Sequence, residues 1–370
     1  MSVRKRTWKT SKGETKEAFI VDYVDQQGDR HIETFERKKD ADAYHDKVRQ
    51  DVRLGTHVAP SKSITVAEAC ETWIKRAEAD GLERSTVDQY RQHERLHITP
   101  RLGKVKLANL SSEVVKTFRD ELLENLSRPL ARKVLVSLKM MLRHAGRGQV
   151  ADNVTIKHDG RHKRKLEVGK DNPTPSEIKR MIVVATDKRA RALLLLAAFT
   201  GLRSSELRGL RWADIDLKDS ELHVRQRADK YYAIGSPKSE GSRRKVPLDS
   251  GVLIPALKEW KMACPRFESD LVFPGTEGGP VHHKFLLRLL RSLMAVAGIR
   301  NKYGLHSFRH FFASWCINPR SEGGRELPPK AAQVLLGHSS ITMTLDVYGH
   351  LFPAGNDRDE LAASVKSLLA

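Results

Sequence analysis

The chain has 370 residues, enough for two or three domains with hydrophobic cores of their own. Its 66 Lys and Arg against 46 Asp and Glu leave a formal net charge of +20, which exceeds what an acidic small molecule requires and makes nucleic acid the first hypothesis. The three cysteines are far apart in the sequence, which argues against a disulfide framework and a Cys-x-x-Cys metal site and favours a reducing cytoplasm. The longest apolar run, residues 192–199, is too short to span a membrane.

The first segment of the chain predicts a β-hairpin followed by a helix. Residues 17–24 and 30–35 are short runs rich in β-forming residues, and a polar, glycine-containing turn separates them. A polar helix is expected over 38–54. Residues 4–16 are basic and are expected to form a flexible tail. The module of residues 1–60 is interpreted either as a nucleic-acid-binding unit, which its basic tail favours, or as a packing or dimerisation appendage.

An all-helical domain is expected over residues 63–150. Apolar residues recur at helical spacing near both of its ends, first at Val66, Ala69, Trp73 and Ala77 and later at Leu130, Val134, Leu138, Met141 and Ala145. Two more helices are expected between these stretches, over 85–97, with Ser85 as the N-cap, and over 112–125. Helices with apolar faces of this kind predict a compact core-forming domain.

A basic linker is expected over residues 151–172. Between residues 154 and 170 the sequence has six Lys or Arg side chains and only two acidic ones. A run of this kind is often no more than a solvated spacer, but between two basic domains it also suits a segment that follows a phosphate backbone.

The remaining residues, 173–370, predict one larger mixed domain. Thr174 caps a helix that begins at Pro175, and a strongly apolar helix is expected over 190–200. Strand signals occur at 221–226 and at 230–248, the latter as one or two hairpins with a mobile tip. Further helices are expected at 251–263, 281–297, 307–317, 329–336, 340–348 and 358–369. The predicted fold class is mainly α with small antiparallel β-sheets (α+β).

Several common catalytic motifs are missing from the sequence. It has no Walker A loop, no GxGxxG motif after a strand, no HExxH and no GxSxG. Asp214 and Asp216 are interpreted as ordinary loop residues rather than as a two-metal carboxylate cluster. His306 and His310 stand four apart, but no third ligand accompanies them, so no metal site is expected. Nucleotide hydrolysis and metal-dependent hydrolysis therefore lose their support.

Two clusters in the last domain each combine an arginine with a second ionisable side chain, a glutamate in one and a histidine in the other. Arg203 and Glu206 lie three apart, just after Gly201 ends the apolar helix, and by themselves they could be an ordinary surface ion pair. His306 and Arg309 share one face of a later helix, whose aromatic residues are expected to be core.

Two more clusters complete the set. His338 follows a Leu-Gly pair, and Tyr348 lies ten residues beyond it. Its helical spacing from Ile341 and Leu345 also allows Tyr348 to be a core aromatic. Lys238 lies near the tip of a predicted hairpin, where a lysine is usually just exposed to solvent.

Together, the order and spacing of these residues resemble the signature of the tyrosine recombinases, also called the phage integrase family. The matching positions are Arg203, Lys238, His306-x-x-Arg309, His338 and Tyr348. The surrounding segments TGLRSSELRGLRWADIDL, SPKSEGSRRKVPL, HSFRHFFAS and LLGHSSITMTLDVYGHL are similar to the family's boxes. The resemblance covers residues 170–352. The helical domain resembles the family's core-binding (SAM-like) domain, and the first 60 residues are similar to its arm-binding domains.

This resemblance implies site-specific DNA recombination, the integration and excision of a mobile element through a 3′-phosphotyrosyl intermediate. The implied roles are nucleophile for Tyr348, its base for His306, phosphate stabilisation for Arg203 and Arg309, general acid for Lys238, phosphate orientation for His338, and support of the arginine or histidine groups for Glu206. No cofactor and no metal ion is implied, because the tyrosyl ester stores the energy of the broken bond.

The resemblance also implies partners. They are double-stranded DNA attachment sites, further copies of the chain in a synaptic homotetramer, an excisionase and a host DNA-bending protein, in a nucleoid-associated cytoplasmic location with no membrane. Two alternatives remain: DNA relaxation of the type IB topoisomerase kind, and a noncatalytic DNA-binding regulator. The N-terminal hairpin module favours the integrase over the topoisomerase, and the presence of all six signature residues argues against the regulator.

Overall fold

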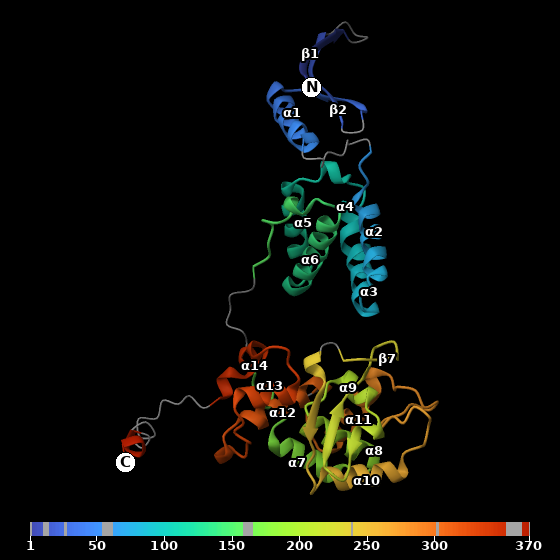
Figure 1. Ribbon diagram of the computed structural model, residues 1–370, viewed down its shortest axis with the longest axis vertical. Coiled ribbons are helices and arrows are strands. Elements are labelled where there is room, and N and C mark those ends of the chain that lie inside the picture. The colour runs from blue at the N-terminus through green and yellow to red at the C-terminus, as the bar shows by residue number, and fades with distance from the viewer. Residues whose placement is uncertain are drawn as a thin grey trace. The chain divides into compact units, whose positions relative to one another are not determined.

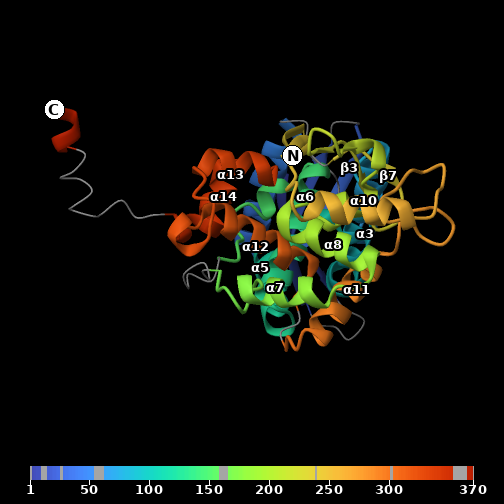
Figure 2. The same cartoon turned by 90° about the horizontal axis from the view of Figure 1, so that it is seen from below.

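The computed structural model describes residues 2–9, 15–25, 28–53, 62–157, 166–237, 240–300, 303–352 and 365–369. The chain forms two compact units, Met1–Asp159 and Gly160–Ala370 (Figure 1, Figure 2). Helices dominate, and the sheets are small and antiparallel, which confirms the predicted fold class. Within the described ranges, no helix is both long enough and apolar enough to span a bilayer.

A three-stranded antiparallel sheet and one helix form the N-terminal part of the first unit. The elements are β1 (Ser2–Lys9), β2 (Thr15–Val24), β3 (Arg30–Phe35) and α1 (Lys38–Arg53), with the strand order β1-β2-β3. Val21 and Tyr23 of β2 pack with Ala41 and Val48 of α1 to form a small core. The predicted hairpin and the helix after it are confirmed.

The prediction of a flexible basic tail is wrong for residues 4–9, which pair with β2 as part of β1, and for residues 15 and 16, which begin β2. Asp22 on β2 accepts hydrogen bonds from Arg4 on β1 and from Arg30 on β3, so one carboxylate joins all three strands. Hydrogen bonds and charge from Arg30, with a further contribution from Arg4, lower the pKa of Asp22 to about 2. Residues 10–14 of the predicted tail lie outside the described residues.

Helices α2 to α6 form the rest of the first unit. They are α2 (Val66–Ala79), α3 (Arg84–His93), α4 (Thr99–Leu102), α5 (Ser112–Asn125) and α6 (Arg128–His144), and a π-helical turn at Glu94–Ile98 joins α3 to α4. Thr65 and Glu68 form a capping box that begins α2. Trp73, Phe118 and Met141 are among the buried side chains of a single core shared by these helices.

Two details of this bundle differ from the sequence-based expectations. Ser85 is not the N-cap of α3: Glu83 precedes the helix and makes no side-chain cap, so Ser85 lies within the first turn. Val154 and Ile156, which belong to the segment predicted as linker, are buried in the core of the bundle. The described residues that follow this stretch begin again at Leu166, in the second unit.

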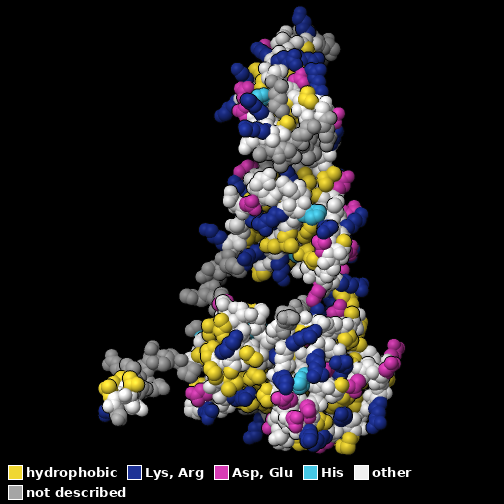
Figure 3. All heavy atoms as spheres, in the orientation of Figure 1, with side chains coloured by type: hydrophobic (Ala, Val, Ile, Leu, Met, Phe, Trp, Pro, Cys, Tyr) yellow, Lys and Arg dark blue, Asp and Glu magenta, His cyan; other side chains and the backbone are white. Residues whose placement is uncertain are grey.

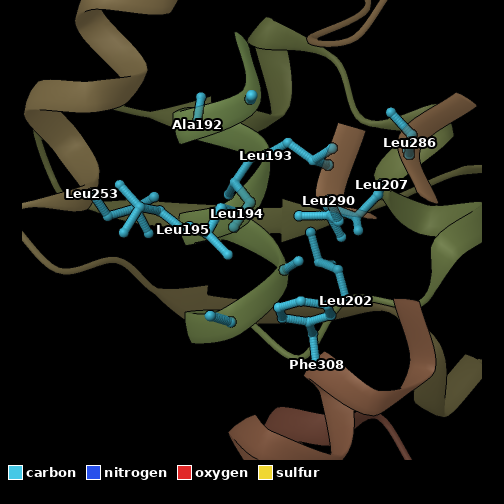
Figure 4. Close-up of a cluster of buried hydrophobic side chains, with 14 of the residues drawn as sticks. Ala192, Leu193, Leu194, Leu195, Leu202, Leu207, Leu253, Leu286, Leu290 and Phe308 are labelled. Carbon is cyan, nitrogen blue, oxygen red and sulfur yellow. The ribbon is translucent and has the colours of Figure 1, made fainter. Parts of the chain in front are cut away.

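The second unit is built around α8 (Lys188–Phe199), in which every residue from Ala192 to Ala198 is buried. A helix that is apolar on all sides has to be enclosed by other elements. The enclosing helices are α7 (Pro175–Val184), α10 (Leu253–Ala263), α11 (His283–Val296) and α12 (Leu305–Ile317). Figure 4 shows Leu193, Leu194 and Leu195 of α8 among Leu253, Leu290 and Phe308, which come from three of these helices.

Short strands and helices complete the second unit. The strands are β4 (Ile215–Asp216), β5 (Glu221–Val224) and β8 (Arg244–Pro247), in the order β4-β5-β8, and the separate pair β6 (Arg227–Ala228) and β7 (Ile234–Gly235). The remaining helices are α9 (Ser204–Gly209), α13 (Pro329–Leu336) and α14 (Ile341–Tyr348). Of the predicted C-terminal helix, residues 365–369 are helical and the preceding residues lie outside the described ranges.

We predict that Gly201→Ala destabilises the second unit more than Gly298→Ala does. Both glycines have a positive φ, +61° and +65°, so a side chain at either position strains the backbone by about 1–2 kcal/mol. A Cβ atom on Gly201 would in addition overlap the ring of Phe312, whereas a Cβ atom on Gly298 would meet no atom within 4 Å. Urea unfolding of both variants measures the difference. Equal losses would mean that Phe312 moves aside without cost.

Candidate active site

The turn after α8 places Arg203 at the start of α9. Gly201 adopts a left-handed conformation there, with φ +61°, which glycine reaches without strain. The backbone N–H of Arg203 donates to Oε2 of Glu206 at 2.9 Å, so the carboxylate caps the helix that it belongs to. Glu206 is only 3% exposed. Arg203 and Glu206 are therefore not an exposed surface pair, because the carboxylate of Glu206 is buried and caps α9.

Glu206 lies between two guanidinium groups. Nη1 of Arg203 donates to its Oε1 at 2.8 Å, and Nη2 of Arg244 donates to its Oε2 at 2.9 Å. Arg244 comes from an inward-facing position of β8 and also donates to the carbonyl oxygen of Leu335 at 2.7 Å. Burial by itself raises the pKa of Glu206, but the charges and hydrogen bonds of Arg244 and Arg203 outweigh it and hold the pKa below its usual range. The ionised carboxylate therefore fixes both arginines.

Arg309 on α12 is buried, with 1% of its surface exposed. Its guanidinium donates to the carbonyl oxygens of Gly201 and Leu336, from the turn after α8 and the end of α13. Arg203 donates to the next carbonyl oxygen, that of Gly337, at 2.9 Å. Burial, followed by repulsion from neighbouring arginines, lowers the pKa of Arg309 to about 9. Adjacent backbone carbonyls thus hold two of the predicted site arginines close together.

Two predicted histidines lie near these arginines. Nδ1 of His338 is 2.9 Å from Oγ1 of Thr344. Burial and the positive charges of Arg309 and Arg203 lower the pKa of His338 to about 4. His306 is more exposed, and partial desolvation together with the charges of the same two arginines lowers its pKa as well. Both imidazoles are therefore neutral at pH 7, and the positive charge of the site resides on its arginines.

Tyr348 is the last residue of α14, and only 2% of its surface is exposed. Its ring packs in a hydrophobic cluster with Phe312 and Leu336. Its hydroxyl lies 2.6 Å from Nδ1 of His310 on α12. Burial raises the pKa of Tyr348 above its usual range, although the charge of Arg309 opposes this shift. The ring of Tyr348 is therefore part of the hydrophobic core, as its helical spacing allowed, and its hydroxyl is held close to Arg309.

The structure brings most of the sequence-predicted site residues into one region of the second unit. These residues are Arg203, Glu206, His306, Arg309, His338 and Tyr348. Lys238 lies outside the described residues. Among the residues that the structure describes, no three His, Cys, Asp or Glu side chains are grouped so that they could hold a metal ion.

Sequence reasoning missed two residues of this region. Arg244 stands in an Arg-Arg-Lys run, and the only signal for its burial is its alternation with Val246 along a strand. His310 follows His306 by four residues, which places both on one helix face but does not reveal the contact with Tyr348.

Comparison with known proteins shows the family. Residues 173–354 match the phage integrase family, and residues 65–123 match the phage integrase N-terminal SAM-like domain. The chain belongs to the phage integrase family. The resemblance recognised in the sequence is thereby confirmed, and membership places the chain among the enzymes that recombine DNA.

Individual relatives agree with this assignment. The tyrosine recombinase XerC-like protein of Caldanaerobacter subterraneus subsp. tengcongensis is 28% identical over 347 residues, 85% of this chain and 86% of that protein. The Tn1549 transposon integrase in complex with circular intermediate DNA has a TM-score of 0.60 at 21% identity and covers 82% of this chain and 100% of its own. A lambda integrase tetramer bound to a Holliday junction has a TM-score of 0.57 at 16% identity, with coverages of 95% and 96%. At these identities the two structures show a shared fold.

We predict that Glu206→Gln destabilises the second unit by about 3–5 kcal/mol at pH 7, because it leaves the buried guanidinium of Arg244 and the partly exposed one of Arg203 without their counter-charge. The pKa of Glu206 in the folded protein lies below its value of about 4.3 in an unfolded chain, so its contribution is complete above that pH and is lost as the pH falls toward the folded pKa. The difference between wild type and variant should therefore shrink below about pH 4.3. Chemical unfolding as a function of pH measures it.

The matched control is Glu259→Gln, at an exposed position of α10. Its unfolding free energy should stay within about 0.5 kcal/mol of wild type at every pH. A difference for Glu206→Gln that does not change down to pH 3 would contradict the assignment of a buried, ionised carboxylate.

Proposed function

We propose that the protein is a site-specific recombinase that integrates and excises a mobile element by breaking and rejoining DNA through a 3′-phosphotyrosyl intermediate. The observation that carries the proposal is the gathering of Arg203, Arg309 and His338 in the region that holds the hydroxyl of Tyr348. Family membership supports the reaction class, and the DNA-bound integrases of the same fold support DNA as the substrate.

In this reaction, Oη of Tyr348 attacks the scissile phosphorus and the bond to the 5′ oxygen breaks. Attack by the 5′ hydroxyl of a partner strand reverses the step, so the energy of the bond is kept. Arg203 and Arg309 stabilise the negative charge on the nonbridging oxygens. Glu206 and backbone carbonyl oxygens already hold these guanidiniums in place, so little reorganisation is needed when the charge develops.

Two protons have to move during this step. The departing 5′ oxygen needs a proton, and we assign Lys238 as the general acid on the basis of the family signature. His338, a neutral imidazole, orients the phosphate through a hydrogen bond. The phenol of Tyr348 has to lose its proton, and the family signature implies His306 as its base.

Neither of the two alternative functions gains support. The matched families and relatives are integrases and recombinases, so no observation favours relaxation of supercoils by a type IB topoisomerase. A noncatalytic regulator would not need a tyrosine hydroxyl held next to arginines that are themselves fixed by a buried carboxylate. The recombinase therefore remains the single proposal.

The proposed assembly is a homotetramer on two DNA duplexes. A lambda integrase of the same fold forms a tetramer bound to a Holliday junction. In this chain, Val334, Met343 and Leu345 on α13 and α14 are exposed apolar side chains, as are Leu368 and Leu369 near the C-terminus. Such side chains suit contacts between subunits. An excisionase, a host DNA-bending protein and association with the nucleoid complete the proposal.

We further propose that residues 1–60 bind arm-type DNA sites. In the three-stranded sheet, Arg4, Arg6 and Trp8 of β1 are exposed, and so is Arg30 of β3. Lys and Arg side chains are also spread over the visible surface of both units (Figure 3). Basic and aromatic side chains on one short sheet provide the charge and contact area that a DNA groove requires.

We predict that Tyr348→Phe abolishes formation of a covalent protein-DNA adduct, because the ring remains but the attacking oxygen is lost. The substrate is a nicked suicide duplex that carries the attachment core, and a denaturing gel detects the adduct. Tyr232→Phe, at an exposed tyrosine, is the matched control and should form the adduct at the wild-type rate. If wild type and Tyr348→Phe gave the same result, the catalytic proposal would be wrong.

We also predict that deletion of residues 1–60 abolishes integration while binding to the core site persists. The helical bundle and the second unit keep their own cores in the truncated chain. Gel-shift assays on core and arm duplexes, together with an integration assay, separate the two effects. Normal integration by the truncated protein would refute the arm-binding role.

A further inference from the structure

His310 is the polar side chain that contacts the hydroxyl of Tyr348. Its Nδ1 lies 2.6 Å from the tyrosine oxygen, and the two ring centroids are 5.7 Å apart with an interplanar angle of 58°. The contact joins α12 to α14, and the two residues are 38 positions apart in the sequence. A distance of this length is that of a well-formed hydrogen bond rather than of chance proximity.

The protonation states fix the direction of this hydrogen bond. Burial, followed by the charges of His306 and Arg309, lowers the pKa of His310 to about 4, while burial raises the pKa of Tyr348. Both groups are therefore neutral at pH 7. The phenol O–H donates and Nδ1 accepts, which leaves the imidazole proton on Nε2.

The backbone of α12 holds the imidazole in a defined position. Phe308, Phe311 and Phe312, on the same helix, are buried in the hydrophobic clusters of the second unit. His306 lies one turn earlier, with its ring centroid 4.5 Å from that of His310. His306 is the more exposed of the two rings, and the hydroxyl of Tyr348 contacts His310.

We propose that His310 is a catalytic residue that accepts the phenolic proton of Tyr348 during attack on the phosphate. This role rests on the proposed recombinase function and concerns the same site. The proton passes from Oη to Nδ1 as the Oη–P bond forms and the bond from phosphorus to the 5′ oxygen breaks. The 5′ oxygen takes its proton from the general acid. In the reverse step His310 returns its proton to the tyrosine.

The charges around His310 explain how a weakly basic imidazole takes up this proton. His306 and Arg309 on α12 disfavour the imidazolium, and Asp171, from the segment before α7, favours it. On α14, the facing group is Tyr348 itself. A bound phosphodiester brings a negative charge to the arginines and offsets their repulsion of a proton on His310. The imidazole therefore becomes a stronger base when DNA occupies the site.

The test compares His310→Ala and His310→Asn in the full-length protein. In Asn, Oδ1 takes roughly the place of Nδ1 and accepts a hydrogen bond, but it does not take up a proton near neutral pH. Rates of adduct formation are measured under single-turnover conditions on the nicked attachment-core duplex, from pH 6 to pH 10, with and without added imidazole. His283→Asn, at an exposed position of α11, is the matched control, and His306→Ala is measured in parallel.

The expected result is a loss of at least about 100-fold at pH 7 for both His310 variants, with DNA binding unchanged. The loss should shrink as the pH rises, because a larger fraction of the Tyr348 phenol is then ionised without the help of His310. Added imidazole should restore part of the rate of His310→Ala. The rate of His283→Asn should stay within about twofold of wild type.

Three results would overturn the role of His310. A near-normal rate for His310→Asn would show that accepting a hydrogen bond is sufficient. A loss that neither pH nor imidazole alters would indicate a structural role only. A near-normal rate for His310→Ala beside a large loss for His306→Ala would transfer the role to His306. Absence of an adduct with wild type would instead refute the recombinase proposal itself, and the role of His310 with it.

Discussion

The buried carboxylate of Glu206 is the interaction on which the rest of the site depends. Arg203, Arg244 and Arg309 lie within electrostatic reach of one another, and Glu206 is the acidic side chain that binds two of them directly. Without that negative charge, several buried guanidiniums would repel one another with little solvent to screen them. The same carboxylate caps α9, so the local helix and the long-range ion pairs stabilise each other.

This arrangement also determines the state of the site before DNA binds. Burial, with the neighbouring positive charges, keeps the imidazoles of His338 and His310 neutral, and Tyr348 is buried with its hydroxyl bound to His310. Before DNA binds, the hydroxyl of Tyr348 therefore already lies against the imidazole that we propose as its base. Arrival of a phosphodiester supplies a negative charge to the arginines and a target for the tyrosine at the same time.

The sequence predicted the helices and the order of the site residues, because both are expressed as local patterns. Apolar periodicity placed α2 and α6, and an apolar run placed the buried α8. The structure adds contacts between distant segments, which no local pattern contains. Asp22 on β2 binds arginines from both β1 and β3, and burial of Arg244 depends on which residue of a basic run faces inward. The contact of His310 with Tyr348 depends on how α14 packs against α12.

The segment that precedes α7 is attached to the same hydrophobic cluster that encloses the ring of Tyr348. Leu166 packs against this cluster. Nε2 of His350, two residues after Tyr348, donates a hydrogen bond to the carbonyl oxygen of Leu166 at 3.2 Å. Three residues later, the carbonyl oxygen of Gly169 lies 2.9 Å from the hydroxyl of Tyr303, which fixes the segment to the body of the second unit. The packing of Leu166 and the contact of His350 therefore tie the segment before α7 to the cluster that holds the ring of Tyr348.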